Sequence, residues 1–182
     1  MQISKLSKRL QGLNIYIIGI MGSGKSTVGR PLAKLLNYSF IDTDKVIEGV
    51  TNSKISEIFI HHGESYFRSL EQNVLKEISQ RHSLIIATGG GIVTKASNWG
   101  TMHQGIVVWL DLAPSTIQLR LSMDGIERPL IMNTNLEVKL QDLMKDRRSL
   151  YGEADLHILP DNDSPEKVAQ QIVEALPGIL KL

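Results

Sequence analysis

The chain has 182 residues, of which 42% are hydrophobic, so it can bury one sizeable core and one domain is expected. A formal net charge of +1 gives no overall attraction to polyanions, no cysteine is present, and no apolar run reaches the roughly 18 residues that cross a membrane. These properties exclude disulfide and thiolate chemistry and argue against nucleic-acid and membrane partners. We expect a cytoplasmic protein.

The first twelve residues are basic and contain serine but lack the apolar segment of a secretory signal. We expect a helix here, with a trimmed transit peptide as the alternative. Further along, apolar runs predict five strands, over residues 14–18, 39–42, 84–88, 106–111 and 156–159. Apolar residues at helical spacing predict helices over residues 28–36, 44–50, 55–61, 65–80, 115–123, 136–151 and 165–176. This alternation predicts an α/β fold, with a parallel sheet that carries helices on both faces.

Residues 19–27 read Gly-Ile-Met-Gly-Ser-Gly-Lys-Ser-Thr and match the phosphate-binding loop pattern G-x-x-x-x-G-K-[ST]. The glycines allow positive φ and let backbone amides approach a phosphate closely. Lys25 can reach the β- and γ-phosphates, and the Ser26 hydroxyl can bind Mg²⁺. Because a predicted strand precedes the loop and a predicted helix follows it, the phosphate would sit at a helix N-terminus.

Acidic residues follow two of the predicted strands. Asp42 and Asp44 are one residue apart, so one could hold Mg²⁺, directly or through water, while the other engages a substrate hydroxyl. The alternative is an ordinary helix N-cap. Asp111 ends another apolar strand and is a rival metal ligand. Ligands of open parallel sheets bind beyond the carboxyl ends of the strands, which is where all three acids are expected.

Three glycines at residues 89–91 follow the third predicted strand and offer bare backbone donors to a ligand, or form only a tight turn. Arg68 lies about one turn inside a predicted helix. It could fork onto a ligand carboxylate. From spacing alone, however, ion pairs with Glu64 or Glu71 on a solvated helix face are favoured.

Residues 123–135 contain Gly, Pro, Asn and charges with weak periodicity, which predicts a mobile segment. Arg128 is the only arginine in this segment. It suits a lid that closes over a triphosphate, and a solvated loop charge is the alternative. Arg147 and Tyr151 are four residues apart on one predicted helix, where Arg147 could be an ordinary cation of the last turn.

These residues together resemble the shikimate kinase family. The resemblance covers about residues 12–176, in order, and the joint set is far more specific than the phosphate-binding loop alone. Its signatures are the loop at 19–27, Phe-Ile-Asp-Thr-Asp-Lys-Val-Ile-Glu at 40–48, Gly-Glu-Ser-Tyr-Phe-Arg-Ser-Leu-Glu at 63–71, Gly-Gly-Gly at 89–91, Arg-Pro-Leu at 128–130 and Arg-x-x-x-Tyr at 147–151. The segment Gly-Ile-Val-Val-Trp-Leu-Asp also resembles plant and cyanobacterial members.

The resemblance implies a three-layer P-loop kinase fold, with a five-stranded parallel sheet in the order 2-3-1-4-5 and helices on both faces. It implies one domain over residues 1–182, with a lid at about 123–135 and a substrate-binding helical region at about 43–72. The implied activity is phosphorylation of the shikimate 3-hydroxyl by ATP, with Mg²⁺ as cofactor. We expect a monomer whose partners are these two small molecules.

The resemblance also implies a role for each matching residue. ATP is bound by the loop and three further positions, namely Gly22, Ser23, Gly24, Lys25, Ser26, Thr27, Arg120, Arg128 and Pro165. Shikimate is bound by Asp44, Arg68, Gly89, Gly90, Gly91 and Arg147. The catalytic residues are Lys25, Asp44 as the base, and Arg128. Ser26 binds Mg²⁺, Asp42 reaches it through water, and Asp111 is then only a strand-end residue. This interpretation replaces the solvated ion pairs of Arg68 with a role in binding the substrate carboxylate.

The chain departs from the family where many members carry an arginine that stacks on adenine. That position is Leu121 here, and the role passes to its neighbour Arg120. Two other functions are considered, a kinase of another small hydroxy acid such as gluconate, and an inactive kinase-like regulatory protein. Arg68 with Arg147 and the Asp-x-Asp pair favour shikimate over gluconate. The intact catalytic residues argue against a loss of activity.

Overall fold

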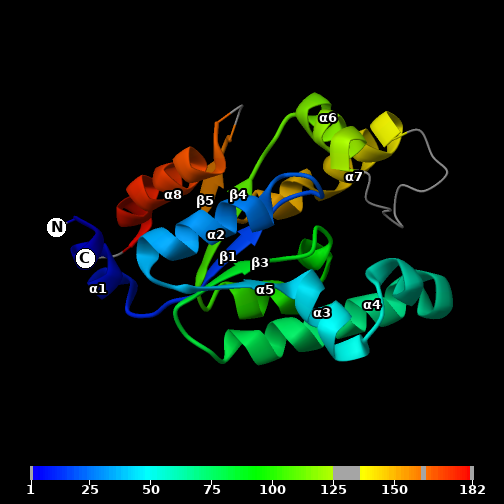
Figure 1. Cartoon of the computed structure of the whole chain (residues 1–182), viewed down its shortest axis with the longest axis horizontal. Coiled ribbons are helices and arrows are strands. Elements are labelled where there is room, and N and C mark those ends of the chain that lie inside the picture. Colours follow the sequence, from blue (N-terminus) through cyan, green and yellow to red (C-terminus); the bar gives the residue numbers. More distant parts are fainter. Residues whose placement is uncertain (1, 125–135, 161–162, 181–182) are drawn as a thin grey trace.

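The structure is a computed structural model that describes residues 2–124, 136–160 and 163–180. Within these residues, five parallel strands form one sheet in the order β2-β3-β1-β4-β5 (Figure 1). They are β1 (Ile15–Ile18), β2 (Ser39–Asp42), β3 (Leu84–Ala87), β4 (Ile106–Leu110) and β5 (Leu156–Ile158). The expected fold class and strand order are therefore confirmed.

Side chains of the central strand β1 alternate between the two faces of the sheet. Ile15 and Ile17 join the apolar cluster on one face, whereas Tyr16 and Ile18 join the cluster on the other. All residues of β1, and of its neighbours β3 and β4, are buried. Burial on both faces explains why these strands were visible in the sequence as continuous apolar runs.

Helices cover both faces of the sheet (Figure 1). On one face lie α1 (Gln2–Leu10), α2 (Lys25–Leu36) and α8 (Pro165–Ile179), which contribute Leu10, Leu32 and Ile172 to the first apolar cluster. On the other face lie α3 (Thr43–Thr51), α4 (Ile55–Ser79) and α5 (Ala96–Met102), which contribute Ile47, Leu75 and Trp99 to the second cluster. The helix expected at the N-terminus is confirmed as α1.

Two further helices, α6 (Pro114–Asp124) and α7 (Leu136–Tyr151), lie beyond the carboxyl ends of the strands (Figure 1). They pack together in a third apolar cluster that includes Ile117, Leu121 and Leu140, together with Ile20 of the phosphate-binding loop. This cluster joins the two helices to the loop. Residues 125–135, which make up most of the expected lid, lie outside the described residues.

Two parts of this helical layer differ in detail from the expectation. The helices expected at 55–61 and 65–80 lie within α4, which is broken at Gly63 by a backbone conformation (φ 76°, ψ 174°) that glycine adopts readily. The helix α5, preceded by the short 3₁₀ helix η1 (Ile92–Thr94), was not expected. The α5 sequence is rich in weak helix formers, and side-chain hydrogen bonds from Asn98 and Trp99 to the carbonyls of the preceding η1 hold it in place.

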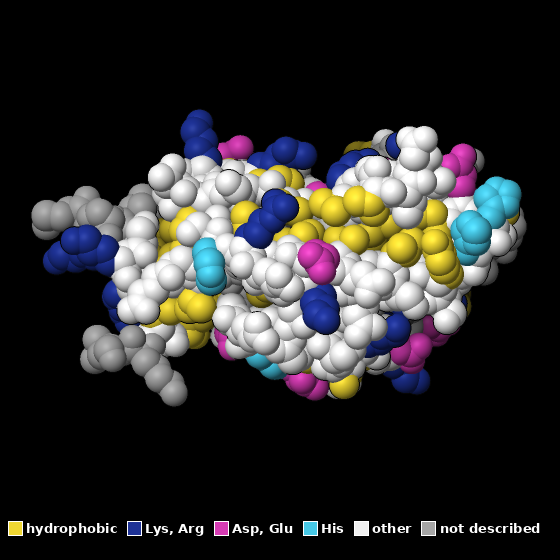
Figure 2. Space-filling model, turned by 90° about the horizontal axis from the view of Figure 1, so that it is seen from below, with side chains coloured by type: hydrophobic (Ala, Val, Ile, Leu, Met, Phe, Trp, Pro, Cys, Tyr) yellow, Lys and Arg dark blue, Asp and Glu magenta, His cyan; other side chains and the backbone are white. Residues whose placement is uncertain are grey.

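Figure 2 looks onto the face that carries α4, where hydrophobic side chains form a band among polar and charged ones. Exposed apolar side chains of α3 and α4 include Val50, Ile60 and Tyr66. None of these three lines the cavities described below. Among the helices of the described ranges, none has the length and apolar character needed to cross a membrane.

Candidate active site

The phosphate-binding loop leaves β1 through three glycines with positive φ, namely Gly19 (146°), Gly22 (77°) and Gly24 (90°). A side chain at Gly19 would also meet the carbonyl oxygen of Leu110 at 2.7 Å, so the close approach of the two chains needs glycine. Gly24 is the N-cap of α2, and no side chain of the described residues caps this helix. The positive end of the helix is therefore presented at the loop, which is the arrangement of an anion site.

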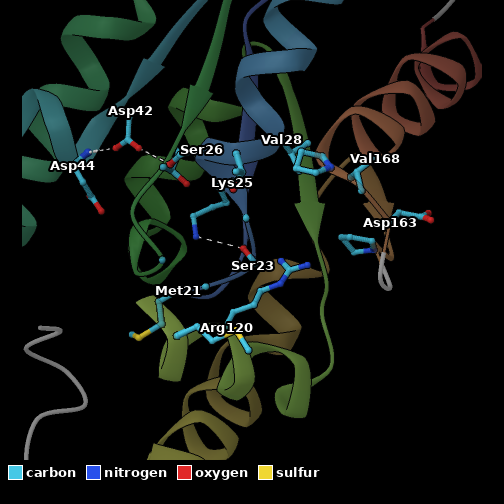
Figure 3. A pocket seen from close by; sticks show the side chains of 18 residues that line it. Met21, Ser23, Lys25, Ser26, Val28, Asp42, Asp44, Arg120, Asp163 and Val168 are labelled. Atoms are coloured by element: carbon cyan, nitrogen blue, oxygen red, sulfur yellow. Dashed lines mark hydrogen bonds between the residues drawn. The ribbon is translucent and has the colours of Figure 1, made fainter. Parts of the chain in front are cut away.

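A cavity of about 570 Å³ opens at this loop. Lys25 lies at its edge and donates hydrogen bonds to the carbonyl oxygens of Gly19 (2.8 Å) and Ile20 (2.9 Å). In Figure 3 the acids that follow β2 lie on one side of the cavity, and Asp163 and Val168 lie on the other. The lining includes the expected ATP-binding residues of the described part of the chain, namely Gly22, Ser23, Gly24, Lys25, Ser26, Thr27, Arg120 and Pro165.

Asp42 has two sets of contacts. Its Oδ2 accepts a hydrogen bond from the Ser26 hydroxyl at 2.5 Å, and its Oδ1 accepts from the backbone amides of Asp44 (3.1 Å) and Lys45 (3.3 Å). The helix-cap interpretation of this acid is therefore confirmed. The same carboxylate also lies beside the Ser26 hydroxyl at the phosphate-binding loop. Two oxygen ligands next to a phosphate site fit Mg²⁺, which is usually bound by one or two carboxylates together with substrate phosphates and water.

A second cavity of about 530 Å³ adjoins the first, and the two share Met21, Asp42, Asp44 and Gly90. It contains two arginines, three glycines and several apolar side chains, with a lining that includes Ile55, Phe59, Phe67, Arg68, Glu71, Gly89, Gly91 and Arg147. All the shikimate-binding residues implied by the sequence are thus brought to one cavity. A volume of this size is ordinary for a small-molecule site.

Asp44 lines both cavities, and Figure 3 shows it beside Asp42 in the first. Burial raises the pKa of its carboxyl to about 6, and the nearby charges of Asp42 and Glu71 act in the same direction, against the opposing effects of Lys25 and Arg68. Its Oδ1 is buried and has no hydrogen-bond partner within the described ranges. A carboxyl group that lines a cavity and has a pKa close to neutrality is suited to accept a proton.

Arg68 is buried and forms ion pairs with Glu71 (2.7 Å) and Glu64 (2.9 Å). The ion pairs expected from helical spacing are therefore confirmed, but Arg68 and Glu71 are buried beside the second cavity and only Glu64 is solvated, with 52% of its side chain exposed. A side chain at Gly91 would overlap the Arg68 guanidinium, so this glycine leaves room for it. Glu71 is only 1% exposed, and burial raises its pKa against the opposing effect of Arg68. Helical spacing predicts the pair of Arg68 with Glu71, but it does not predict that Glu71 lines a ligand site.

The carbonyl oxygen of Gly90, a residue that lines the second cavity, is hydrogen-bonded to two side chains of α7. It accepts hydrogen bonds from the Arg147 guanidinium at 3.2 Å and from the Tyr151 hydroxyl at 2.6 Å. Burial raises the pKa of Tyr151 to about 12, against the opposing effect of Arg147, so the phenol stays a hydrogen-bond donor. Next to it, a side chain at Gly89 would collide with the Glu71 carboxylate. The three glycines thus both form a tight turn and line the cavity.

Arg120, and not Leu121, lies at the first cavity. Leu121 is 8% exposed and belongs to the apolar cluster between α6 and α7. Pro165 lines the same cavity at the start of α8, as expected. Asp163 lines it as well and was not predicted, since an acid in a short loop after the last strand carries no pattern of its own.

One other candidate lies elsewhere. Asp111 lines neither of these cavities and is paired with Arg148 (3.0 Å) and His157 (2.9 Å), so its geometry does not support a metal ligand beside the phosphate-binding loop. Arg128 lies outside the described residues.

A sheet of this order, with a phosphate-binding loop and an adjoining cavity lined by arginines and acids, defines a P-loop kinase of small molecules. A family model described as shikimate kinase matches residues 21–177, and the chain belongs to this family. A protein named shikimate kinase from Synechococcus sp. (strain CC9902) is 52% identical over 179 residues, which cover 98% of this chain and 94% of that protein. The expected resemblance to cyanobacterial members is confirmed.

Solved structures agree with this family. The shikimate kinase from Acinetobacter baumannii in complex with shikimate has a TM-score of 0.90 and 39% sequence identity, and the match covers 95% of this chain and 97% of that one. A gluconokinase from Sinorhizobium meliloti 1021 has a TM-score of 0.57 and 17% identity, over 93% of this chain and 94% of that one. At that identity the likeness is one of fold alone.

Proposed function

We propose that this chain transfers the γ-phosphoryl group of ATP to the 3-hydroxyl of shikimate, giving shikimate 3-phosphate and ADP, with Mg²⁺ as cofactor. The observation that carries the proposal is the pair of adjoining cavities. One is built on the phosphate-binding loop, the other holds Arg68 and Arg147, and Asp44 lies where they meet. A small anionic triol needs these three elements, namely a carboxylate site, a hydroxyl acceptor and a nearby triphosphate site.

In the first cavity, the loop amides and Lys25 bind the phosphates of ATP. Arg120 and Pro165, which also line this cavity, contact the adenine. Ser26 and, through water, Asp42 would hold Mg²⁺, which would supply positive charge to neutralise the charge that develops on the transferring phosphate. Arg128 is assigned from its motif alone, as the cation that meets the transferring phosphate.

In the second cavity, Arg68 and Arg147 bind the substrate carboxylate, because a planar guanidinium matches it with two parallel hydrogen bonds. The glycines at 89–91 line the same pocket and let the ring lie close to the backbone. Asp44 accepts the hydrogen bond of the reacting hydroxyl and takes its proton as the oxygen attacks phosphorus. Little covalent chemistry falls to the protein, so positioning and charge stabilisation supply most of the rate.

The proposal assigns the whole chain, residues 1–182, to one P-loop kinase domain that acts as a monomer. Within it, residues 43–72 form the substrate-binding helical region and residues 123–135 form the lid. This division rests on the placement of Asp44 and Arg68 at the second cavity and on the sequence motif at 128–130.

A coupled assay of ADP release with shikimate, quinate and gluconate tests the proposed substrate against its alternatives. Shikimate should be turned over far faster than the other two, because its ring carries a carboxylate for the arginines and a 3-hydroxyl for Asp44, whereas gluconate is an open chain and quinate has a saturated ring with an extra hydroxyl on the carboxylate-bearing carbon. Faster release with gluconate would favour a kinase of another hydroxy acid. Release at background with all three would favour an inactive kinase-like protein, and either result would reject the proposal.

A further inference from the structure

Asp111, which the proposed reaction does not use, is the centre of a compact cluster at the ends of β4 and β5. Its side chain is 6% exposed. The Arg148 guanidinium donates to Oδ2 at 3.0 Å and to Oδ1 at 3.4 Å, and the His157 ring nitrogen lies 2.9 Å from Oδ2. The backbone amide of Asp111 donates to the carbonyl oxygen of Ile158 at 3.0 Å, so the acid is anchored to the sheet.

Trp109 of β4 joins the members of this cluster. Its ring is stacked on His157, with centroids 4.2 Å apart and planes inclined by 7°. It is also stacked on Tyr151, at 5.7 Å and 20°, and the Arg148 guanidinium carbon lies 5.3 Å from its centroid. Aromatic stacking and a cation over the ring are both attractive, so Trp109 restricts how Tyr151 and Arg148 can move.

The cluster contacts the last turn of α7 through Arg148 and Tyr151, and neither Asp111 nor Arg148 lines the second cavity. Adjacent helical residues point about 100° apart, since 3.6 residues make one turn. Accordingly Arg147 reaches the carbonyl of Gly90 and the second cavity, while Arg148 reaches Asp111. Tyr151 takes part in both, because its hydroxyl donates to Gly90 and its ring stacks on Trp109.

We propose that Asp111 and Arg148 are positioning residues for Arg147. They fasten the last turn of α7 to the sheet, so that the Arg147 guanidinium is held where a substrate carboxylate binds. This inference rests on the proposed function, in which Arg147 binds that carboxylate. A displacement of about 1 Å in a binding group can cost on the order of 100-fold in rate, so even a small shift of Arg147 would be measurable.

The same geometry predicts a small effect on folding. The Arg148 side chain is 58% exposed, and ion pairs with an exposed partner contribute little to stability. Asp111 would also keep His157 as a partner if Arg148 were removed. The loss should therefore be seen in the use of substrate and not in the melting temperature.

The test compares Arg148→Met and Asp111→Asn with Lys145→Met, a matched control that removes an exposed cation from α7 outside the cluster. Contacting residues couple strongly enough to change an affinity about 2- to 10-fold, so both cluster variants should lower kcat/KM for shikimate by that factor. The change should fall on KM for shikimate, with kcat and the KM for ATP unchanged. Arg148→Lys should recover part of the loss, because it keeps the charge but not the two-point contact.

A double variant separates positioning from a general loss. In an Arg147→Ala background, Arg148→Met should have no further effect on kcat/KM for shikimate. Effects that multiply in full would overturn the proposal, as would an unchanged KM for shikimate in both single variants or an equal rise in the KM for ATP. If Arg147→Ala alone left shikimate use normal, the proposed role of Arg147 would fail first. Asp111→Asn keeps the side-chain shape, so the test stands even if Arg148→Met folds poorly.

Discussion

Replacing Arg68 or Arg147 by alanine should weaken shikimate binding to a similar degree but should affect stability very differently. Each loss leaves a bound carboxylate under-paired, which costs about 2–5 kcal/mol. That corresponds to roughly 30-fold or more in affinity. ATP binding should change far less, because neither arginine lines the cavity of the phosphate-binding loop.

The difference in stability follows from the partners of each arginine. Arg68 pairs with Glu71 at 2.7 Å, and the two side chains are 9% and 1% exposed. Breaking a buried ion pair by removing one partner costs about 3–5 kcal/mol. That range is an upper bound here, because burial already raises the pKa of Glu71 and the acid can take up a proton. Arg147 instead donates to a backbone carbonyl, and a single hydrogen bond contributes about 1 kcal/mol.

Calorimetric titration with shikimate and a thermal melt of each variant measure the two effects, with Lys145→Ala as the control on α7. We expect Arg68→Ala to melt well below Arg147→Ala while both bind shikimate poorly. Normal shikimate binding by both variants would mean that the proposed pocket is wrong. Equal melting temperatures would refute the argument from the buried Arg68–Glu71 pair.

Three further changes have definite expected outcomes. In a Mg²⁺ titration at saturating shikimate, Asp42→Asn should impair turnover severely and Asp111→Asn only mildly, and the reverse ranking would contradict the assignment of the metal site. Arg128→Ala should lower kcat by on the order of 1,000-fold, with little change in ATP or shikimate binding or in melting temperature. Arg128→Lys should recover only part of the lost kcat. A near-normal kcat of Arg128→Ala would remove Arg128 from the mechanism. Because the pKa of Asp44 is raised from 3.8 to about 6, the rate should fall as the pH drops through 6. A rate that stays unchanged down to pH 5 would exclude Asp44 as the base. The same shift means that the native state keeps a proton that the unfolded chain releases, so the free energy of unfolding should decrease as the pH rises from about 4 to 6.

The parts of the fold that follow from local pattern were predictable. The strands at the centre of the sheet are apolar on both faces, and the phosphate-binding loop has a fixed spacing that its backbone geometry requires. The helix α5 was missed because Ser, Asn, Trp, Gly and Thr carry little helix propensity. It is held by side-chain hydrogen bonds from Asn98 and Trp99 to carbonyl oxygens six residues earlier, and the spacing of apolar residues does not encode such bonds.

Site residues that belong to a sequence motif were predictable, whereas those whose role depends on burial in the folded chain were not. Spacing alone correctly paired Arg68 with Glu64 and Glu71 but put them on a solvated face, because helical spacing does not reveal which face is covered. Here Gly91 packs against Arg68, and Gly89 lies against the carboxylates of both Glu71 and Asp44. Asp163 could not have been found, since a single acid outside any motif gives no sign that it lines the first cavity.

The central claim is that the two cavities bring ATP and shikimate together for one transfer, and product analysis tests it most directly. The protein is incubated with ATP, Mg²⁺ and shikimate, and the product is examined by phosphorus and proton magnetic resonance. We predict a phosphate ester on the 3-hydroxyl of shikimate, formed only when Mg²⁺ is present and formed poorly by Asp44→Asn. Inorganic phosphate as the sole product, or an ester on another hydroxyl, would contradict the account.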